Sequence, residues 1–372
     1  MQLPQFGVED WLNHWEKSAT YDLAQSTISS LTMHEILNLD GHDGQEFYDM
    51  LDRSVMNYGW IEGSPEFKQL VSGFYDHMDP DNILQTNGAT GANLLAITAL
   101  VGEKDHVIAE YPSYQQLYDL PRGLGADVDY WTIHEEDGWY PDLEELKELI
   151  RPDTRMICLN NANNPTGTFL SPDFLREIVR IADSVGAYIL VDEVYAPMEK
   201  NASYCSIVDL YDRGIAVNSL SKTYSVPGVR IGWTASNKET ADMFRRYRDY
   251  LLICGGVFND QLAVYVLRHR QQILERNRRL VYQDMDIYRE WVDNEPRVSI
   301  VMPPAISTSF PKFDIPQDIE EFCLDLLRRR GVLLVPGTRF DVPGHVRLGY
   351  CTKPEVLKEG LARLSQAFRE FD

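Results

Sequence analysis

The sequence predicts an α/β protein whose larger part is a mainly parallel sheet covered by helices on both faces. Between residues 83 and 250, short apolar runs alternate with helical segments. The runs are continuous rather than alternating, as in strands buried on both sides. Polar clusters follow several of these runs, at the strand ends where such sheets bind ligands. After residue 255 a long charged helical stretch and short strands predict a separate α+β lobe.

Charge and composition exclude several classes of protein. The chain has 372 residues, with 35 Lys and Arg against 57 Asp and Glu, so the net charge is 35 − 57 = −22. An acidic chain is repelled by phosphate backbones and anionic membrane surfaces, so neither a nucleic acid nor a membrane is an expected partner. No apolar run approaches the ~20 residues that span a bilayer, and the start lacks the pattern of a signal peptide.

The cysteines indicate the compartment. There are five, an odd number, and none has C-x-x-C spacing. This pattern argues against a disulfide framework and against a structural metal site, and it favours a reducing environment. We therefore expect a cytoplasmic protein without a metal.

The individual elements follow from periodicity and capping residues. Trp11 and Trp15, spaced i and i+4, predict a short helix, and Ser64 followed by Pro65 predicts a helix start. Asp142 is expected to cap another helix. Strands are expected at 83–86, 106–110, 127–133, 155–159, 188–191, 215–219, 298–301, 332–335 and 345–348, and helices at 31–39, 93–101, 142–150, 172–185, 261–291, 318–330 and 355–371.

The segment 87–92 (NGATGA) lies between a predicted strand and a predicted helix. Small residues at this junction leave backbone N–H groups free to bind an anion, so Ala89 and Thr90 are candidates for phosphate binding. Close packing of a helix on the sheet would give the same residues, and the segment alone does not decide between the two explanations.

Lys222 is the central candidate for chemistry. It follows a run of small residues that includes Ser219, and Arg230 comes eight residues later, after a Pro-Gly turn. A lysine forms an imine near neutral pH only when its surroundings lower its pKa. Hydroxyls and an arginine beside it suit a phosphate-bearing aldehyde, so the stretch 219–233 predicts pyridoxal 5′-phosphate (PLP) held as a Schiff base. A surface lysine in a serine-rich loop is the alternative.

Six motifs along the chain resemble those of the class I/II aminotransferases, the aspartate-aminotransferase family of PLP fold type I. They are NGATGA, PSY, NNPTG, DEVY, SLSKTYSVPGVRIGW and VRLGY, in the order and spacing of that family, over residues 58 to 350. The resemblance implies a large domain with a mainly parallel seven-stranded sheet between helices, residues 41–260. It also implies a small α+β domain made of residues 1–40 and 261–372, and a homodimer with shared active sites.

The resemblance also implies roles for individual residues. Lys222 would hold PLP and move the substrate proton, and Asp192 would pair with the ring nitrogen, although a helix-capping carboxylate is its alternative. Tyr195 and Asn164 would bind the ring oxygen, and Tyr114 would stack on the ring. The phosphate of PLP would be bound by Ala89, Thr90, Ser219 and Arg230. Tyr58 would reach the phosphate in the partner subunit. Arg347, together with Asn164, would bind the substrate carboxylate.

The reaction predicted from this resemblance is transfer of an amino group between an L-amino acid and a 2-oxo acid. Three departures from the family pattern leave the substrate open: residues 23–28 lack a glycine, Ala162 replaces a common proline, and 303–307 replaces a glycine-containing segment. A carbon–sulfur β-lyase, or a β-replacing or cyclising enzyme similar to the capreomycidine synthases, would use the same site. A PLP-fold transcription regulator is disfavoured because only some 25 residues precede the fold.

Overall fold

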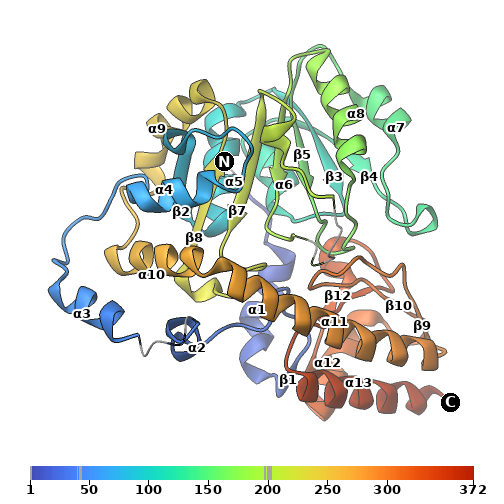
Figure 1. Ribbon diagram of the computed structural model, residues 1–372. Coiled ribbons are helices and arrows are strands. Elements are labelled where there is room, and N and C mark those ends of the chain that lie inside the picture. Colours follow the sequence, from blue (N-terminus) through green and yellow to red (C-terminus); the bar gives the residue numbers. More distant parts are fainter. Residues whose placement is uncertain (1, 40, 42–43, 197, 199–202) are drawn as a thin grey trace.

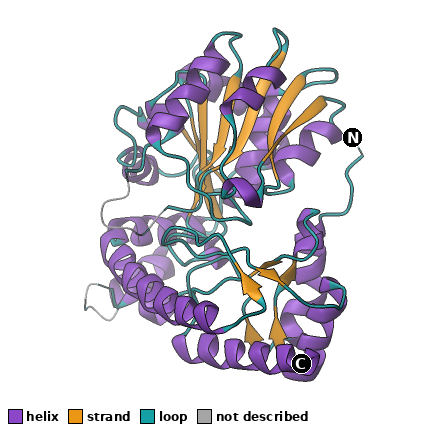
Figure 2. Ribbon diagram, turned by 90° about the vertical axis from the view of Figure 1, so that its right-hand side faces the viewer, coloured by secondary structure: helices purple, strands orange, loops and turns teal. Residues whose placement is uncertain are grey.

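The computed structural model describes residues 2–39, 41, 44–196, 198 and 203–372, and it shows two lobes (Figures 1 and 2). The upper lobe in both views contains the large sheet, and the lower lobe contains shorter strands beside long helices. No helix in the described ranges is both long and apolar enough to cross a membrane.

The large sheet has seven strands in the order β2-β8-β7-β6-β5-β3-β4. Only β8 runs antiparallel to its neighbours β2 and β7, so the sheet is mainly parallel, as predicted. The carboxyl ends of the parallel strands therefore meet at one edge, which faces the lower lobe (Figure 2). The strands are β2 (Ile83–Asn87), β3 (His106–Tyr111), β4 (Asp127–Thr132), β5 (Thr154–Asn160), β6 (Tyr188–Asp192), β7 (Gly214–Ser219) and β8 (Ile231–Ala235).

Helices cover both faces of this sheet. Alternate strand residues pack into two separate apolar clusters, one on each side, which explains why the strands read as continuous apolar runs. One face is covered by α5 (Gly88–Leu100), α6 (Gln116–Gly123) and α9 (Lys238–Leu251), and the other by α4 (Pro65–Ser72), α7 (Leu143–Leu149), α8 (Pro172–Asp183) and α10 (Val257–Arg268).

The lower lobe joins the two ends of the chain. Strand β1 (Tyr21–Asp22) pairs in parallel with β11 (Val332–Leu333), and α1 (Gly7–Trp15) packs in the same apolar core. The other elements of this lobe are α11 (Arg270–Asn294), α12 (Ile319–Arg330), α13 (Pro354–Phe368), β9 (Val298–Ser299), β10 (Lys312–Phe313), β12 (Val335–Pro336) and β13 (Val346–Arg347).

Two predicted elements are corrected by the structure. The expected single helix over 261–291 is two helices, α10 and α11, because His269 leaves helical geometry and its ring Nδ1 bonds the Tyr265 carbonyl at 2.8 Å. The helix expected from residue 93 begins at Gly88, so the NGATGA segment is its first turn. Gly88 makes this early start feasible because its φ of +67° suits glycine.

The predicted caps are confirmed at Ser64, which accepts from Phe67 N, and at Asp142, which accepts from Glu144 N. Two short helices link the lobes, α2 (Met33–Leu37) and α3 (Gln45–Arg53). Their buried residues Ile36, Leu37 and Phe47 belong to the core of the large sheet. The predicted domain bounds stay a prediction.

Candidate active site

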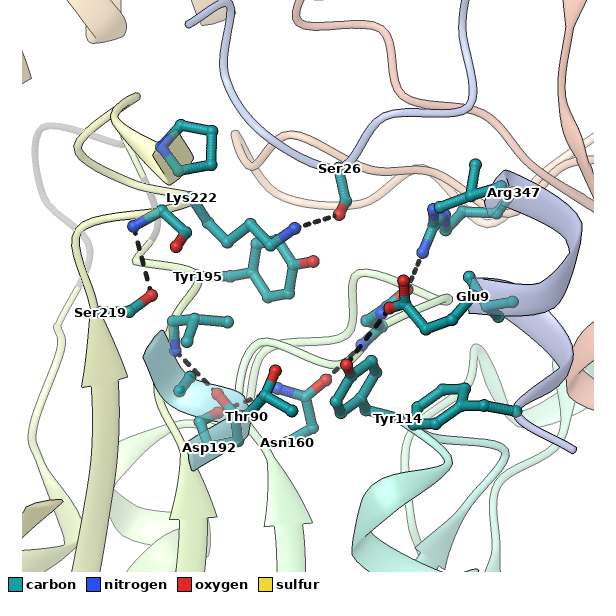
Figure 3. A pocket seen from close by; sticks show the side chains of 18 of the residues that line it. Glu9, Ser26, Thr90, Tyr114, Asn160, Asp192, Tyr195, Ser219, Lys222 and Arg347 are labelled. Carbon is teal, nitrogen blue, oxygen red and sulfur yellow. Dashed lines mark hydrogen bonds between the residues drawn. The ribbon is translucent and has the colours of Figure 1, made fainter. Parts of the chain in front are cut away.

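A cavity of about 600 Å³ lies where the carboxyl edge of the large sheet meets the lower lobe. It brings together every predicted site residue except Tyr58, from segments as distant as β6 and β13 (Figure 3). The predicted residues that line it are Ala89, Thr90, Tyr114, Asn164, Asp192, Tyr195, Ser219, Lys222, Arg230 and Arg347.

Lys222 lies in the loop after β7, with its amine pointing into the cavity (Figure 3). Its Nζ donates to Ser26 Oγ at 2.8 Å, and no carboxylate is paired with it within the described part of the chain. Burial, assisted by the nearby positive charge of Arg347, lowers the pKa of Lys222 to about 8, against an opposing effect of Glu9 and Asp192. A sizeable share of this amine is therefore neutral near physiological pH, which a nucleophilic or basic role requires.

Asp192 ends β6 and is 3% exposed. Its Oδ2 accepts from Asn93 Nδ2 at 2.7 Å, and its Oδ1 accepts from Val194 N at 3.3 Å. Burial raises the pKa of Asp192 to about 6, although both hydrogen bonds and the charge of Lys222 oppose the rise. The carboxylate is thus ionised at neutral pH but poorly solvated, so a cationic partner facing it in the cavity would be strongly favoured.

Asn93 is a site residue that the sequence analysis missed. It is fully buried in α5, and its amide donates directly to Asp192. Its sequence signature is a polar residue at a sheet-facing position of an otherwise apolar helix. Because the sequence analysis expected this helix to begin only at residue 93, Asn93 fell at its predicted first residue and not on its buried face.

The N-terminus of α5 faces the cavity through Ala89 and Thr90. Asn87, which precedes the helix, makes no side-chain cap, so first-turn N–H groups are available to a ligand. Arg230 lies directly above this turn, since a Cβ on Gly88 would approach its Nη2 to 2.6 Å. Uncapped amides, a guanidinium and the adjacent Ser219 together form an anion site.

Arg347 lies on β13 of the lower lobe and is 2% exposed. Its Nη2 donates to the Ala24 carbonyl at 2.7 Å, and its Nη1 donates to Asn164 Oδ1 at 3.2 Å. Its Nε is buried and has no partner among the described residues. Burial lowers the pKa of Arg347, and an anion bound at its free positions would offset that cost.

Aromatic and amide groups complete the walls. Tyr114 packs against Phe6 with ring centroids 5.1 Å apart, and its hydroxyl donates to Glu9 Oε1 at 3.3 Å. Burial raises the pKa of Tyr195 to about 12, so its phenol is a hydrogen-bond donor at neutral pH. Asn160, not predicted from the sequence, accepts from Asn164 N at 2.8 Å and thereby fixes the loop after β5.

Tyr58 lies outside this cavity. It is 79% exposed and borders a different hollow with Trp60 and Val257. The sequence analysis assigned it to the partner subunit's phosphate, and in a single chain that role stays a prediction.

The residues present fit PLP. The anion site suits its phosphate, the amine of Lys222 suits its aldehyde, and the buried carboxylate of Asp192 suits its protonated ring nitrogen. No group of three or more His, Cys, Asp or Glu side chains in the described ranges is placed to hold a metal ion.

The family described as aminotransferase class I and II matches residues 44–364. The chain belongs to this family. It is accordingly a PLP-dependent enzyme, and its seven-stranded sheet is that of PLP fold type I.

Individual members of the family are similar to this chain over most of its length. A crystal structure of a PLP-dependent aminotransferase from Streptococcus suis is 55% identical with a TM-score of 0.98, covering 100% of this chain and 99% of that one. Capreomycidine synthase from Streptomyces vinaceus is 28% identical over 98% of this chain and 94% of its own length. Aspartate aminotransferase from Thermotoga maritima is 28% identical over 80% and 78% respectively.

Proposed function

We propose that this aminotransferase-family enzyme transfers an amino group between an L-amino acid and a 2-oxo acid, with Lys222 as the residue that bonds PLP and moves the proton. The observation that carries the proposal is the amine of Lys222, whose pKa is lowered to about 8 and which faces both Asp192 and Arg347 across one cavity. These three groups can serve an aldehyde, a ring nitrogen and a substrate carboxylate at the same time.

The cofactor would be held at three points. The first turn of α5, with Ser219 and Arg230, would hold the phosphate, and Asp192 would hold the ring nitrogen. Tyr114 would cover the ring, while Tyr195 and Asn164 would donate to its oxygen. When bound, the cofactor supplies an electron-accepting ring that makes the substrate Cα–H acidic.

Lys222 would then act as the proton carrier. Its Nζ, once neutral, accepts the proton from the substrate Cα and returns it to the carbon that receives the amino group. Ser26 holds this amine at 2.8 Å, so the proton carrier has a defined resting position. Because Lys222 lines the cavity, a substrate bound there would exclude water from its amine.

Arg347 would orient the substrate. Its guanidinium is fixed by Ala24 and Asn164, and its buried Nε and remaining N–H groups are free to bind an α-carboxylate. A planar fork held on two sides fixes the angle of the bound carboxylate as well as its position. The Cα–H bond is thereby held toward Lys222.

The test is a half-reaction without any 2-oxo acid. An aminotransferase releases at most one equivalent of 2-oxo acid per site, keeps the nitrogen on the enzyme and then stops. We expect this stoichiometry with at least one amino acid of a panel, measured by quenched-flow and mass spectrometry. Continuous release of ammonia would contradict the proposal and identify an eliminating lyase, such as a carbon–sulfur β-lyase.

A β-replacing or cyclising reaction is the second candidate, favoured by the similarity to capreomycidine synthase over 98% of the chain. Both reactions begin with proton removal from Cα, so the same three residues would serve either. The same experiment separates them, because a cyclase turns over repeatedly and releases neither a 2-oxo acid nor ammonia.

The proposal includes a homodimer. The segment 55–61 exposes Val55, Met56, Tyr58, Trp60 and Ile61, an apolar run that a second copy would cover. A separate hollow of about 330 Å³ is lined by Thr90, Arg230 and Leu251, so it opens beside the anion site. In a dimer, the partner's Tyr58 would enter this hollow and reach the phosphate. Light scattering should report a dimer, and Met56→Asp should weaken it; a monomeric wild-type protein would contradict this part.

We place the enzyme in the cytoplasm because its five cysteines are all free in the structure, as expected in a reducing compartment. Fractionation of the producing cells would test this assignment.

A further inference from the structure

Six Asp, Glu, Lys and Arg side chains line the active-site cavity, and the proposed function uses only four of them. The three cations are Lys222, Arg230 and Arg347, and Asp192 is the carboxylate for the ring nitrogen. The two groups left without a role are both carboxylates. Glu9 lies on α1 and Glu16 lies just after it, so both come from the same N-terminal segment.

Glu9 projects from α1 into the cavity on the side opposite Lys222, next to Arg347 and Tyr114 (Figure 3). Its only hydrogen bond among the described residues comes from the Tyr114 hydroxyl at 3.3 Å, and no ion pair includes it, although Arg347 attracts it from a greater distance. The negative charge of Glu9 interacts with the cations of the site, since it opposes the fall in the pKa of both Lys222 and Arg347. A cation bound beside Glu9 would complete its pairing.

The position of Glu9 is fixed before any ligand binds. Trp11 Nε1 donates to the Leu334 carbonyl at 2.8 Å, and Gly7 N donates to Gln115 Oε1 at 2.7 Å. The first bond ties the middle of α1 to the lower lobe, and the second ties its first residue to Gln115, just before α6 in the upper lobe. A carboxylate on a helix tied to both lobes is a preorganised binding group.

The remaining surface on this side of the cavity is apolar and comes from Phe6, Val8 and Leu12. This surface suits an aliphatic chain leading to the charged end of a ligand. A second carboxylate on the substrate would instead lie against Glu9 and Glu16, and no cation that lines the cavity in the described ranges remains to receive it.

We infer that Glu9 selects substrates whose side chain is an aliphatic stem ending in a cation, an ammonium or a guanidinium, over dicarboxylic amino acids. The inference rests on the proposed function in that Arg347 receives the α-carboxylate and so directs the side chain toward α1. Ammonium and guanidinium share the positive charge and the N–H donors that a carboxylate binds, and the test distinguishes the two.

The direct test is equilibrium binding to the holoenzyme of three six-carbon acids that lack an α-amino group and so cannot undergo the Cα reaction. The cofactor absorbance is recorded alongside, to detect any imine formed by the terminal amine of 6-aminohexanoate. All have one carboxylate for Arg347; 6-aminohexanoate adds a cation, hexanoate a methyl group and adipate a second carboxylate. We expect calorimetry to show 6-aminohexanoate binding tightest and adipate weakest. Replacing 6-aminohexanoate by 4-guanidinobutanoate tests whether a guanidinium is preferred to an ammonium.

Glu9→Gln should weaken the binding of 6-aminohexanoate about 10- to 100-fold, which is the range for the loss of a hydrogen bond to a charged group. It should leave hexanoate unchanged, and Glu9→Lys should invert the order of 6-aminohexanoate and adipate. The matched control is Asp10→Asn, which removes the same charge from the same helix at a residue outside the cavity that bonds Gln5 instead.

Three outcomes would overturn the inference: wild-type enzyme that binds adipate as tightly as 6-aminohexanoate, no measurable binding of 6-aminohexanoate, or equal weakening of all three acids by Glu9→Gln. The last result would show a structural role for Glu9. The wild-type comparison needs no variant, so a variant that fails to fold leaves the inference testable.

The kinetic counterpart compares L-lysine, L-norleucine and L-glutamate in the half-reaction. Glu9→Gln should lower kcat/KM for lysine alone, mainly through KM, since Glu9 is remote from the proton transfer. If no amino acid releases a 2-oxo acid but the three acids still bind in the expected order, the proposed reaction fails and the inference stands. If 2-oxo acid is released fastest from glutamate, the inference fails and the reaction stands.

Discussion

The two sides of the cavity are built in different ways. On the proposed cofactor side, Asp192, Lys222 and the start of α5 lie on or next to ends of sheet strands, and Asp192 is backed by the buried Asn93. On the proposed substrate side, Glu9 and Arg347 come from the lower lobe, and Glu9 lies on a helix whose outer residues are partly exposed. The first side is built within one sheet, whereas the second depends on how the lobes meet.

This difference predicts where substitutions should affect catalysis and where they should affect binding. Strand ends are fixed by the ladder of backbone hydrogen bonds, so a carboxylate at the end of β6 has little freedom. A helix attached from the other lobe can change its side chains without disturbing the sheet. Changes on the cofactor side should therefore remove catalysis, and changes on the substrate side should alter binding.

The largest effect is expected for Lys222→Ala. Loss of both the bond to the cofactor and the proton carrier should lower kcat by ~10³-fold or more, since general acid–base catalysis alone accounts for ~10²–10⁴. Stopped-flow assays with added methylamine would check this, because an external amine should restore part of the proton transfer. Activity above a tenth of the wild-type value would contradict the role of Lys222.

Asp192→Asn should reduce kcat by ~10²–10³-fold, the range seen when one charge-stabilising group is removed from an active site. The amide keeps the shape of the carboxylate but cannot hold a protonated ring nitrogen. Cofactor affinity, measured by equilibrium dialysis, should fall together with kcat. An unchanged kcat would show that the ring is not protonated by this residue.

A stability measurement tests the cofactor side without catalysis. Between pH 8 and 10.5 the unfolded chain keeps the Lys222 proton that the folded protein has released, so the free energy of unfolding rises with pH in this window. Lys222→Met removes this dependence. In the cofactor-free protein, Lys222→Met should raise the free energy of unfolding by ~2–3 kcal/mol at pH 7, and this gain should vanish near pH 10.5. Thermal unfolding at both pH values gives the result, and a gain that persists at pH 10.5 would have another origin.

On the substrate side, Arg347→Lys should lower kcat/KM by about 10- to 100-fold, because lysine keeps the charge but loses the planar fork. Most of the loss should appear in KM, and the cofactor affinity should stay as in the wild type. Titration with PLP supplies that control. A loss of cofactor affinity would show that Arg347 serves the other side of the cavity.

The smallest effect is expected for Asn93→Leu, which should lower kcat about 10-fold at neutral pH. This is the loss expected when one buried hydrogen bond to a charged group is removed. Its hydrogen bond lowers the pKa of Asp192, so without it that pKa rises and the acid limb of the activity profile moves to higher pH. A uniform loss at all pH values would mean that Asn93 only supports packing.

The sequence predicted the sheet, and it also named most of the residues that line the upper-lobe side of the cavity, because both depend on local patterns. Continuous apolar runs fix buried strands, and polar residues after them, such as Asp192 and Asn164, fall at one edge of a parallel sheet. Arg347 came only from the family resemblance, since nothing local distinguishes it from a strand arginine in a salt bridge.

The missed residues share a different property: their roles depend on contacts between segments far apart in the chain. Ser26 reaches Lys222 across 196 residues, and Asn93 reaches Asp192 across 99. Nothing in the sequence around Glu9 distinguishes it from a surface glutamate, and only the packing of α1 against both lobes places it in the cavity. The break at His269 was missed because it rests on one side chain bonding a carbonyl rather than on a glycine or proline.

The pairing of β1 with β11 also affects how the protein is made. Val8, Trp11 and Leu23 belong to an apolar core that includes residues 332–335 and later ones, so this core is incomplete while some 300 intervening residues leave the ribosome. The sheet of the upper lobe has all its strands by Ala235 and can form earlier. A nascent chain halted before Arg347 would carry the proposed cofactor-side residues and Glu9 but could not assemble the substrate side, and its apolar N-terminal residues would stay exposed to chaperones.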